Sequence, residues 1–307
     1  MAGINQIKKR KPRAFGDRGR THGQIVPIPK KELIVDKKIE NKTALAKTLG
    51  VSRSLLYYQP RLKEKDWKLK QEMEKVLRDF PSYGHKRLAI HLKINKKRTL
   101  RVMKLFGIKP YRRRGKKWRK TKKNPLVAYP NLLLTEFPKY LNHIWVSDFT
   151  YLSFKGNWIY LATIMDLFSR EIVGFSILTN HSAQLTINAM LSAIHKHPAP
   201  KIIHSDQGSE YLSKDYIELV ENLGIRLSMS AKGSPWENGY QESFYSQFKV
   251  DLGDPSRFET LGELVYEIYQ TIYIYNNRRI HTALKMPPII YANQFLISEL
   301  VSKEMGT

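Results

Sequence analysis

The sequence predicts an α/β fold in which a mixed five-stranded sheet with flanking helices follows all-α modules. Three β-prone segments follow one another from residue 144, and helices and strands alternate from residue 182 onward. Before residue 110, apolar residues instead recur at the three- and four-residue spacing of helices. With 307 residues, of which 42% are hydrophobic, the chain is long enough for two or three domains.

The charge of the chain is unevenly distributed. There are 53 Lys and Arg against 27 Asp and Glu, so the formal net charge is +26. Residues 1–140 carry 40 basic and 10 acidic residues, whereas residues 141–307 carry 13 and 17. Such an excess predicts a polyanionic partner. A basic half joined to a slightly acidic half favours a nucleic-acid enzyme over a basic ribosomal or chromatin protein, in which the acidic half would have no explanation.

Several classes of protein are excluded by what the sequence lacks. There is no cysteine, which excludes disulfides, thiol chemistry and zinc sites built on thiolates. No apolar run approaches the length of a transmembrane helix, and no apolar stretch follows the basic N-terminus, so we expect neither a membrane span nor a secretory signal. Neither G-x-G-x-x-G nor a Walker A sequence occurs, so no nucleotide cofactor is predicted.

The first half is predicted to begin with a flexible arm and a helix-turn-helix-like segment. Residues 1–40 are rich in basic residues, Gly and Pro and form the predicted arm. Within residues 41–60, Leu45 and Leu49 lie one helical turn apart, Gly50 supplies a turn, and Ser52 is suited to cap a second helix. Arg53 would then lie early on a DNA-recognition helix, although an ordinary helical hairpin remains an alternative.

A second helical DNA-binding module is predicted over residues 64–108, followed by a basic linker over residues 109–140. The module has a helix over residues 67–80, another opened by residues 82–87, and a third from Lys97 to Gly107. The linker holds ten basic residues between residues 109 and 123, interleaved with Tyr111 and Trp118, which favours DNA tracking over a plain spacer. The predicted DNA contacts of these two segments are Lys97, Arg98, Arg101, Arg112, Arg113, Arg114, Lys116 and Lys117.

The α/β core is predicted over residues 141–252, and a helical extension over residues 253–307. Three consecutive strands followed by helix, strand, helix, strand and helix indicate a mixed sheet and not a doubly wound nucleotide-binding fold. The expected strands are 144–152, 158–166, 171–178, 201–204 and 225–230, and the expected helices are 182–197, 216–223 and one from residue 237.

Three carboxylates in this core are the candidate catalytic residues. Asp148 lies within an apolar, aromatic strand, where an acid is costly unless it is paired, metal-bound or facing a cleft. Asp206 follows the fourth strand, and Glu242 lies on the helix after Gly233-Ser234-Pro235. If the first and fourth strands are neighbours, the two aspartates become adjacent and the helix can deliver the glutamate. Oxygen ligands alone favour Mg²⁺ or Mn²⁺, and two such ions suit phosphodiester chemistry.

Other polar residues near these positions are predicted to have supporting roles. Asp166 is expected to pair with Arg170 at a strand end, and Glu237 to favour the dipole of the following helix. Glu210 is expected to lie beside the site or to face DNA. The lone histidines His204 and His281 are expected to be structural more often than catalytic.

Several motifs resemble one known family. Trp145-Val-Ser-Asp148-Phe-Thr-Tyr151, His204-Ser-Asp206-Gln-Gly208 and Ser234-Pro-Trp-Glu-Asn-Gly-Tyr-Gln-Glu242-Ser-Phe244 resemble the insertion-sequence transposases of the IS3 family, which share the retroviral-integrase core. The 35 residues between Asp206 and Glu242 match the family's D,D(35)E spacing. Lys249, seven positions after Glu242, matches a DNA-contacting lysine, and Tyr275-Asn-Asn-Arg278-Arg279-Ile-His281 matches the C-terminal signature. Upstream, residues 49–57 and the Tyr83-Gly-His-Lys-Arg87 motif resemble the second-frame product, so the resemblance spans residues 43–292.

The resemblance implies an RNase H-like core that cleaves and joins DNA. Asp148, Asp206 and Glu242 would hold two Mg²⁺ (or Mn²⁺) ions, and Lys249, Arg278 and Arg279 would contact phosphate. Double-stranded DNA, both the terminal inverted repeats of the element and the target, and a second copy of the chain would be partners, in a prokaryotic cytoplasm. An RNase H-type nuclease that only hydrolyses and a catalytically silent DNA-binding regulator remain alternatives.

The sequence departs from the family pattern at two places. No first-frame region is recognisable in residues 1–42, which leaves open whether the chain is one product of a frameshifted element or a short form. Position 239 is Gly where the family has Ala, at a small cost in helix propensity.

Overall fold

The computed structural model describes residues 42–50, 52–56, 62–111, 129–231 and 238–305. These residues divide into two compact units, one ending at Gln71 and the other beginning at Glu72. The first unit contains α1 (Lys42–Leu49), α2 (Arg53–Leu56) and the start of α3 (Leu62–Asp79). Gly50, between α1 and α2, has a φ of 62°, a left-handed conformation that glycine adopts readily. Two short helices therefore flank a glycine turn where the sequence predicts them, and the predicted arm over residues 1–40 lies outside the described residues.

The second unit begins with the helical module formed by the rest of α3, α4 (His85–His91) and α5 (Lys96–Leu105). The side chain of Asn95 caps α5 by accepting a hydrogen bond from the backbone N–H of Lys97 at 2.8 Å. Tyr83, Leu88 and Val102 are fully buried, which is the apolar pattern expected of packed helices. Of the predicted basic linker, residues 112–128 lie outside the described part of the chain.

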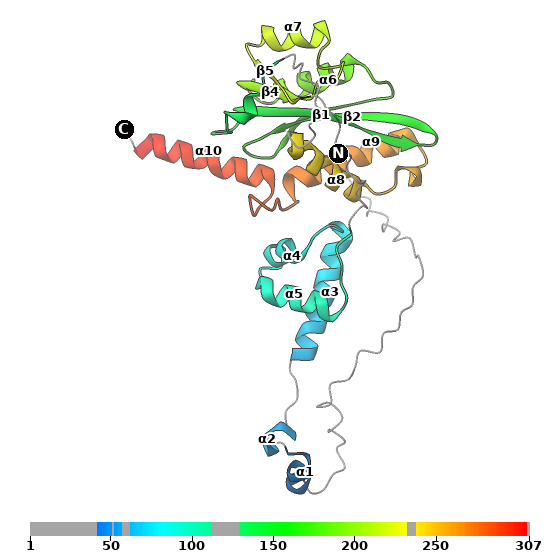
Figure 1. The fold of residues 1–307 in the computed structure, drawn as a ribbon, viewed down its shortest axis with the longest axis vertical. Coiled ribbons are helices and arrows are strands. Elements are labelled where there is room, and N and C mark those ends of the chain that lie inside the picture. Colours follow the sequence, from blue (N-terminus) through cyan, green and yellow to red (C-terminus); the bar gives the residue numbers. More distant parts are fainter. Residues whose placement is uncertain (1–41, 51, 57–61, 112–128, 232–237, 306–307) are drawn as a thin grey trace, which may run out of the picture. The chain divides into compact units, whose positions relative to one another are not determined.

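A mixed five-stranded sheet forms the centre of the second unit (Figure 1). Its strands are β1 (Ile144–Phe154), β2 (Asn157–Asp166), β3 (Ile172–Leu178), β4 (Ile202–Ser205) and β5 (Arg226–Met229). The spatial order is β3-β2-β1-β4-β5, in which β2 runs antiparallel to its neighbours β1 and β3, β4 pairs in parallel with β1, and β5 pairs in parallel with β4. This arrangement confirms the predicted mixed sheet, and the pairing of β1 with β4 confirms that the first and fourth strands are neighbours.

Helices cover both faces of the sheet. They are α6 (Ala183–Ile194), α7 (Lys214–Asn222), α8 (Gly239–Leu252), α9 (Leu261–Asn277) and α10 (Pro288–Met305), with short 3-10 helices η1 (Leu132–Leu134) and η3 (Pro255–Arg257). Figure 1 shows α6 and α7 on one side and α8 and α9 on the other. Alternate residues of β1 face opposite sides: Ile144 and Val146 belong to the core under α8 and α9, whereas Trp145 belongs to the core under α6 and α7.

Side-chain hydrogen bonds join the helical module to α8 and to the loop that follows α9. The hydroxyl of Tyr83 accepts from the backbone N–H of Ile280 at 2.7 Å. Arg87 donates to the hydroxyl of Thr282 at 2.9 Å and to the side-chain oxygen of Gln247 at 3.1 Å. Two motifs that are nearly 200 positions apart in sequence therefore meet in the folded chain.

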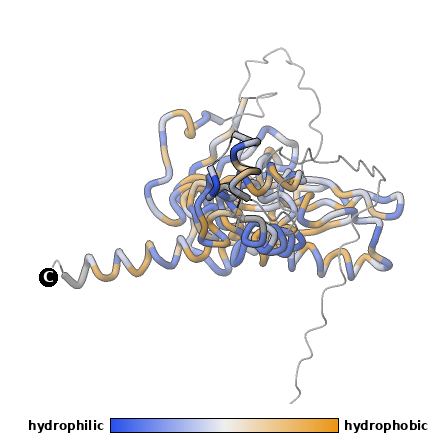
Figure 2. Tube along the Cα trace, turned by 90° about the horizontal axis from the view of Figure 1, so that it is seen from below, coloured by the Kyte–Doolittle hydropathy of each residue, from blue (hydrophilic) through white to orange (hydrophobic). Residues whose placement is uncertain are grey.

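Helix α10 extends from the packed body of the unit. Figure 2 shows it projecting, with hydrophobic and hydrophilic residues alternating along its length. Large apolar side chains on it are exposed, among them Ile297 and Leu300, each at 61%. No helix in the described parts of the chain is long and apolar enough to cross a membrane.

The close packing of β3 against α6 gives a test of the fold. A Cβ atom at Gly174 would lie 2.6 Å from the carbonyl oxygen of Ala189 and 2.6 Å from the Cβ of Ala193. We expect Gly174→Ala to lower the free energy of unfolding by about 1–3 kcal/mol through overpacking, measured by urea denaturation. Gly239→Ala is the matched control, because nothing lies within 4 Å of its added Cβ. Equal stability of the two variants would contradict the packing described here.

Candidate active site

Asp148 lies on β1, and Asp206 directly follows the neighbouring parallel strand β4. In the ladder between β1 and β4, Val146 pairs with His204, and each strand reaches its aspartate two residues later. The two-residue side-chain period of β1 places Asp148 on the same face of the sheet as Val146, and the parallel register brings Asp206 beside β1 at the end of β4. Because β4 ends at Ser205, Asp206 is the first residue of the following loop.

The charge of Asp148 is poorly stabilised by its surroundings. Burial, followed by the negative charges of Asp206 and Glu242, raises the pKa of the Asp148 carboxyl to about 7. The backbone N–H of Phe149 donates to its Oδ1 at 2.8 Å and, with the charge of Lys249, acts in the opposite direction. The negative charges of Asp206 and Glu242 are therefore near enough to act on Asp148.

Gly208 allows the loop after β4 to fold tightly around Asp206. Its backbone N–H donates to Oδ1 of Asp206 at 3.0 Å. A Cβ at this position would lie 3.1 Å from that oxygen and 2.9 Å from Oε2 of Glu210, so a larger residue would displace one of the carboxylates. Burial and the charge of Glu210 raise the pKa of Asp206, whereas the Gly208 amide lowers it. Glu210 is itself buried and pairs with Nε2 of His181 at 2.8 Å, which places it beside the site as expected.

Helix α8 carries Glu242, and a buried polar network holds the helix against β1 and β2. Nε2 of Gln241 donates to the carbonyl of Val146 at 2.7 Å, and the hydroxyl of Tyr245 donates to the carbonyl of Asp148 at 2.6 Å. The hydroxyl of Thr163 donates to Oε1 of Gln241 at 3.1 Å and lies 2.8 Å from that of Tyr245. The sequence analysis missed these residues. The available signal was two polar residues four positions apart, on either side of Glu242.

Glu242 and Lys249 take different positions on α8. Glu242 is solvent-exposed, and partial desolvation raises its pKa. Lys249 is half-buried, with Nζ 5.3 Å from the ring centre of Tyr151. Since Lys249 also lowers the pKa of Asp148, its charge lies near the carboxylates.

The site offers the oxygen ligands that a hard divalent cation prefers, from Asp148, Asp206 and Glu242. Among the described residues, no three His, Asp or Glu side chains already stand in a metal-binding arrangement. The raised pKa of Asp148 nevertheless marks a place where a cation would relieve carboxylate repulsion.

The predicted ion pair between Asp166 and Arg170 does not form. The carboxylate of Asp166 instead accepts from the backbone N–H of Ser169 at 2.9 Å, from its hydroxyl at 2.7 Å, and from the backbone N–H of Asn142 at 3.2 Å. The guanidinium of Arg170 lies 4.1 Å from the ring centre of Tyr240. Nearby backbone and hydroxyl donors therefore take the place of the arginine. Glu237 lies outside the described residues.

His204 has the structural position that the sequence analysis expected. It is fully buried in β4, and its Nδ1 lies 2.8 Å from the hydroxyl of Ser228 on β5. Burial lowers its pKa to about 4, so the ring is neutral at physiological pH.

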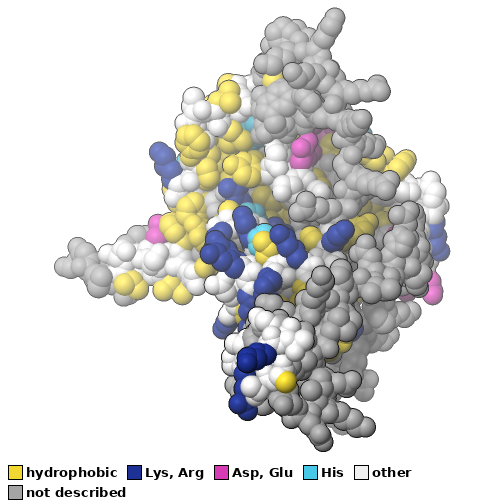
Figure 3. All heavy atoms as spheres, turned by 60° about the horizontal axis from the view of Figure 1, so that its bottom comes forward, with side chains coloured by type: hydrophobic (Ala, Val, Ile, Leu, Met, Phe, Trp, Pro, Cys, Tyr) yellow, Lys and Arg dark blue, Asp and Glu magenta, His cyan; other side chains and the backbone are white. Residues whose placement is uncertain are grey.

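The predicted DNA contacts differ in their accessibility. Arg53, Lys97, Arg101 and Arg278 are exposed, and Arg98 is half-buried. Arg279 is only 2% exposed, and its guanidinium pairs with the carboxylate of Asp251, so the side chain is not available for the DNA contact predicted from the sequence. Figure 3 shows a face of the molecule on which Lys and Arg side chains gather, with few Asp and Glu among them. The predicted contacts Arg112, Arg113, Arg114, Lys116 and Lys117 lie outside the described residues.

Comparison with known proteins gives consistent matches. Two family models described as integrase core domains match residues 140–235 and residues 223–288. The transposase for insertion sequence element IS904 of Lactococcus lactis is 37% identical over 194 residues, covering 62% of this chain and 77% of that protein. The insertion element IS600 uncharacterized 31 kDa protein of Shigella sonnei is 32% identical over 255 residues, covering 78% and 94%. The catalytic core domain of HTLV-2 integrase in complex with magnesium is 22% identical, with a TM-score of 0.40 over 50% of this chain and 97% of that one.

The crowding of the carboxylates predicts a pH-dependent effect of Asp148→Asn in chelator-treated protein. Since the pKa of Asp148 is raised from 3.8 to about 7, ionisation penalises the folded state, and this contribution to stability is lost as the pH rises from about 4 through 7. We expect the variant to be more stable than wild type by about 1–3 kcal/mol at pH 8, and this difference to shrink towards pH 5, measured by urea denaturation.

Asp215→Asn is the matched control, because Asp215 is exposed on α7. It should show no gain in stability at pH 8. A pH-independent effect of Asp148→Asn would contradict the raised pKa of Asp148.

Proposed function

This chain belongs to the insertion-sequence transposases of the IS3 type, and from this we propose that Asp148, Asp206 and Glu242 form its catalytic centre. It is a DNA transposase, and its family makes it a polynucleotidyl transferase. The observation that carries the proposal for the site is the parallel register of β1 and β4, in which the two aspartates follow the paired residues Val146 and His204 by two positions each.

The catalytic centre uses divalent cations, in our proposal two Mg²⁺ or Mn²⁺ ions held by the three carboxylates. The fit rests on the donor chemistry, since all three ligands are oxygens, and on the burial and the neighbouring carboxylates that together raise the pKa of Asp148. When bound, such ions activate an attacking oxygen and stabilise the leaving oxygen at a phosphodiester.

Both steps of the proposed reaction are attacks of an oxygen nucleophile on the phosphorus of a phosphodiester. Water attacks a phosphodiester at the element end, and the bond to the 3′ oxygen breaks to release a 3′-OH. That 3′-OH then attacks a second phosphodiester, so one P–O bond forms as another breaks and no nucleotide is consumed. The protein positions the catalytic groups. Gln241 and Tyr245 hold α8 on the sheet, which keeps Glu242 near Asp148.

Double-stranded DNA is the proposed substrate, both as the ends of the element and as target. Lys249 would place positive charge near the carboxylates, where a scissile phosphate has to lie. Exposed basic residues of the helical segments, together with Arg278, would hold flanking duplex. Since two element ends must be brought together for joining, we propose that at least two copies of the chain act together.

Asp206→Asn tests the assignment of the catalytic centre. In a strand-transfer assay with labelled terminal repeats and Mg²⁺, we expect joining to fall by at least about 100-fold, because the loss of one carboxylate removes several kcal/mol of charge stabilisation. DNA binding should persist in a gel-shift measurement, and Asp215→Asn should join normally. Undiminished joining by Asp206→Asn would refute the site. In the wild type, cleaved but unjoined product would support a nuclease, and binding without any product would support a regulator.

Lys249→Ala tests the proposed phosphate contact. We expect weaker DNA binding, with the slope of log K against log[salt] reduced by about 1, measured by fluorescence anisotropy over a range of KCl concentrations. Lys214→Ala, which removes the same charge from exposed α7, should leave the slope unchanged. If both variants keep the wild-type slope, Lys249 does not contact phosphate.

A further inference from the structure

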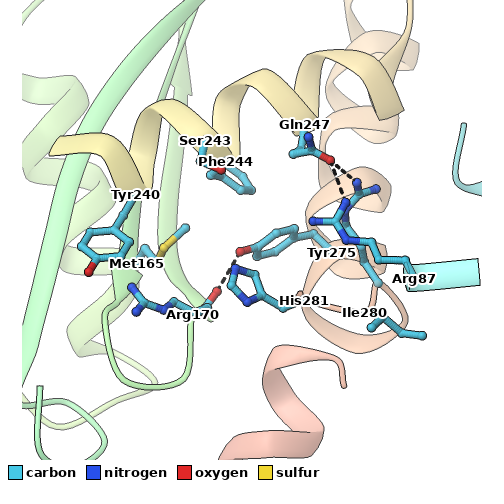
Figure 4. Close-up of a pocket in the computed structure, with 11 residues that line it drawn as sticks. Arg87, Met165, Arg170, Tyr240, Ser243, Phe244, Gln247, Tyr275, Ile280 and His281 are labelled. Carbon is cyan, nitrogen blue, oxygen red and sulfur yellow. Dashed lines mark hydrogen bonds between the residues drawn. The ribbon is translucent and has the colours of Figure 1, made fainter. Parts of the chain in front are cut away.

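A second polar site lies on another side of α8, around a small cavity that is partly open to solvent. The cavity has a volume of about 60 Å³. Figure 4 shows Arg170, Tyr240 and Met165 on one side of it, Arg87 and Gln247 on the other, and His281 between them. Arg279 also lines it. The lining comes from α4, the turn between β2 and β3, α8, the end of α9 and the loop after α9. It contains three guanidinium groups and one imidazole, and none of the described residues that line it is acidic.

The positive charge of this cavity is only partly balanced within the protein. Arg279 pairs with Asp251, which is the compensation that a buried guanidinium requires. Arg87 donates only to neutral groups, the oxygens of Thr282 and Gln247. Arg170 stacks on Tyr240. Three cations therefore share a small volume with one carboxylate, which favours the entry of an anion.

Two buried side-chain nitrogen atoms in the cavity lack a hydrogen-bond partner. Nη1 of Arg170 and Nδ1 of His281 are both shielded from solvent and unpaired in the described structure. Buried polar atoms are normally satisfied, so two such atoms in one cavity point to a missing ligand. Burial, and after it the charges of Arg170, Arg87 and Arg279, lowers the pKa of His281 to about 4.

The backbone at Arg170 adds to this interpretation. Its φ is 63°, in the left-handed region that glycine adopts without strain and that costs other residues of order 1 kcal/mol. Glycine would suit the turn better, yet the position holds an arginine whose guanidinium lines the cavity. Strain of this kind is frequent at binding sites.

The cavity is the right size for a small oxyanion. A water-sized group occupies about 10–15 Å³ by this measure, so the volume accommodates roughly four to six such groups. A phosphate group has four oxygens around one phosphorus. Arginine is suited to phosphate because its planar guanidinium donates two parallel hydrogen bonds.

We propose that this cavity binds a phosphate group, which Arg170, Arg87 and His281 recognise. Its source is either a backbone phosphate of DNA or free inorganic phosphate. Ser243 and Tyr240 on α8 line the cavity on either side of Glu242 in sequence, and Arg87 belongs to the helical module. A bound phosphate would therefore join the helical module to the helix that carries Glu242.

Thermal unfolding of the full chain in inorganic phosphate tests the proposal, with ionic strength held constant by KCl. We expect the Tm of wild type to rise with phosphate and to saturate. Arg170→Gln should weaken the apparent affinity by at least about 10-fold, through the loss of charge-assisted hydrogen bonds. Arg170→Gly should weaken it equally while relieving the strain at φ 63°, which separates loss of binding from loss of folding. Lys214→Gln, which removes the same charge from an exposed position, should bind as wild type does.

The protonation of His281 provides a direct second measurement. In protein with ¹⁵N-labelled histidine, inorganic phosphate should raise the pKa of His281, and Arg170→Gln should remove that effect. Added duplex DNA distinguishes the sources. Displacement of phosphate by DNA indicates a backbone phosphate, and unchanged phosphate binding indicates free phosphate.

The proposal is overturned if phosphate gives no saturable effect in wild type, or if both Arg170 variants bind it as wild type does. Either result leaves the carboxylate site untouched, because none of the cavity residues is one of the three acids.

Discussion

The side chains of Gln241 and Tyr245 hold helix α8 on the sheet. The position of α8 in turn determines the geometry of the carboxylate site and of the arginine-lined cavity. These side chains are buried and donate to the main-chain carbonyls of Val146 and Asp148. Each carbonyl oxygen has a second lone pair, so the strands can accept these bonds and keep their own ladder. A buried hydrogen bond contributes only about 1 kcal/mol, but an unsatisfied partner costs more, so the network strongly disfavours other positions of the helix. One side of α8 then presents Glu242 and Lys249 to the aspartates, and another presents Ser243 and Gln247 to the cavity.

Each of the two sites gathers side chains of one charge, negative in the carboxylate site and positive in the cavity. Asp148, Asp206 and Glu242 gather negative charge, while Arg87, Arg170 and Arg279 gather positive charge on the other side of the same helix. Neither group is fully compensated by the chain itself, and both carry pKa shifts that burial and like charge produce. A protein normally avoids such arrangements because they lower its stability. Such arrangements are frequent at sites that bind charged ligands, and the proposed cations and phosphate would each supply the missing opposite charge.

Prediction from sequence succeeded where short-range pattern decides the structure. Alternation in residues 144–152 and the apolar helix over residues 182–197 identified the sheet and its helices, and the adjacency of the first and fourth strands was a condition that the structure meets. It failed where partners are chosen by tertiary proximity. Arg170 was matched with Asp166 from sequence distance, but Ser169 and Asn142 supply closer donors. Arg279 was predicted to contact DNA, but its guanidinium pairs with Asp251 on α8. This partner lies 28 positions earlier and could not be recognised from the sequence. The spacing of Gln241 and Tyr245 around Glu242 was a signal in the sequence, but their main-chain acceptors on β1 could not be identified from it.

The meeting of the Tyr83–Arg87 motif with Ile280 and Thr282 limits how this protein can be dissected. A fragment starting at residue 141 would keep all three acids and every strand of the sheet. It would lose the hydroxyl that accepts from the N–H of Ile280 and the guanidinium that donates to Gln247 and Thr282. The loop after α9 would then lose its hydrogen bonds to the helical module, so an isolated core of this chain would not reproduce the packing of the whole. The helical module, which the sequence presents as a separate DNA-binding unit, therefore packs as part of the same folded unit as the sheet.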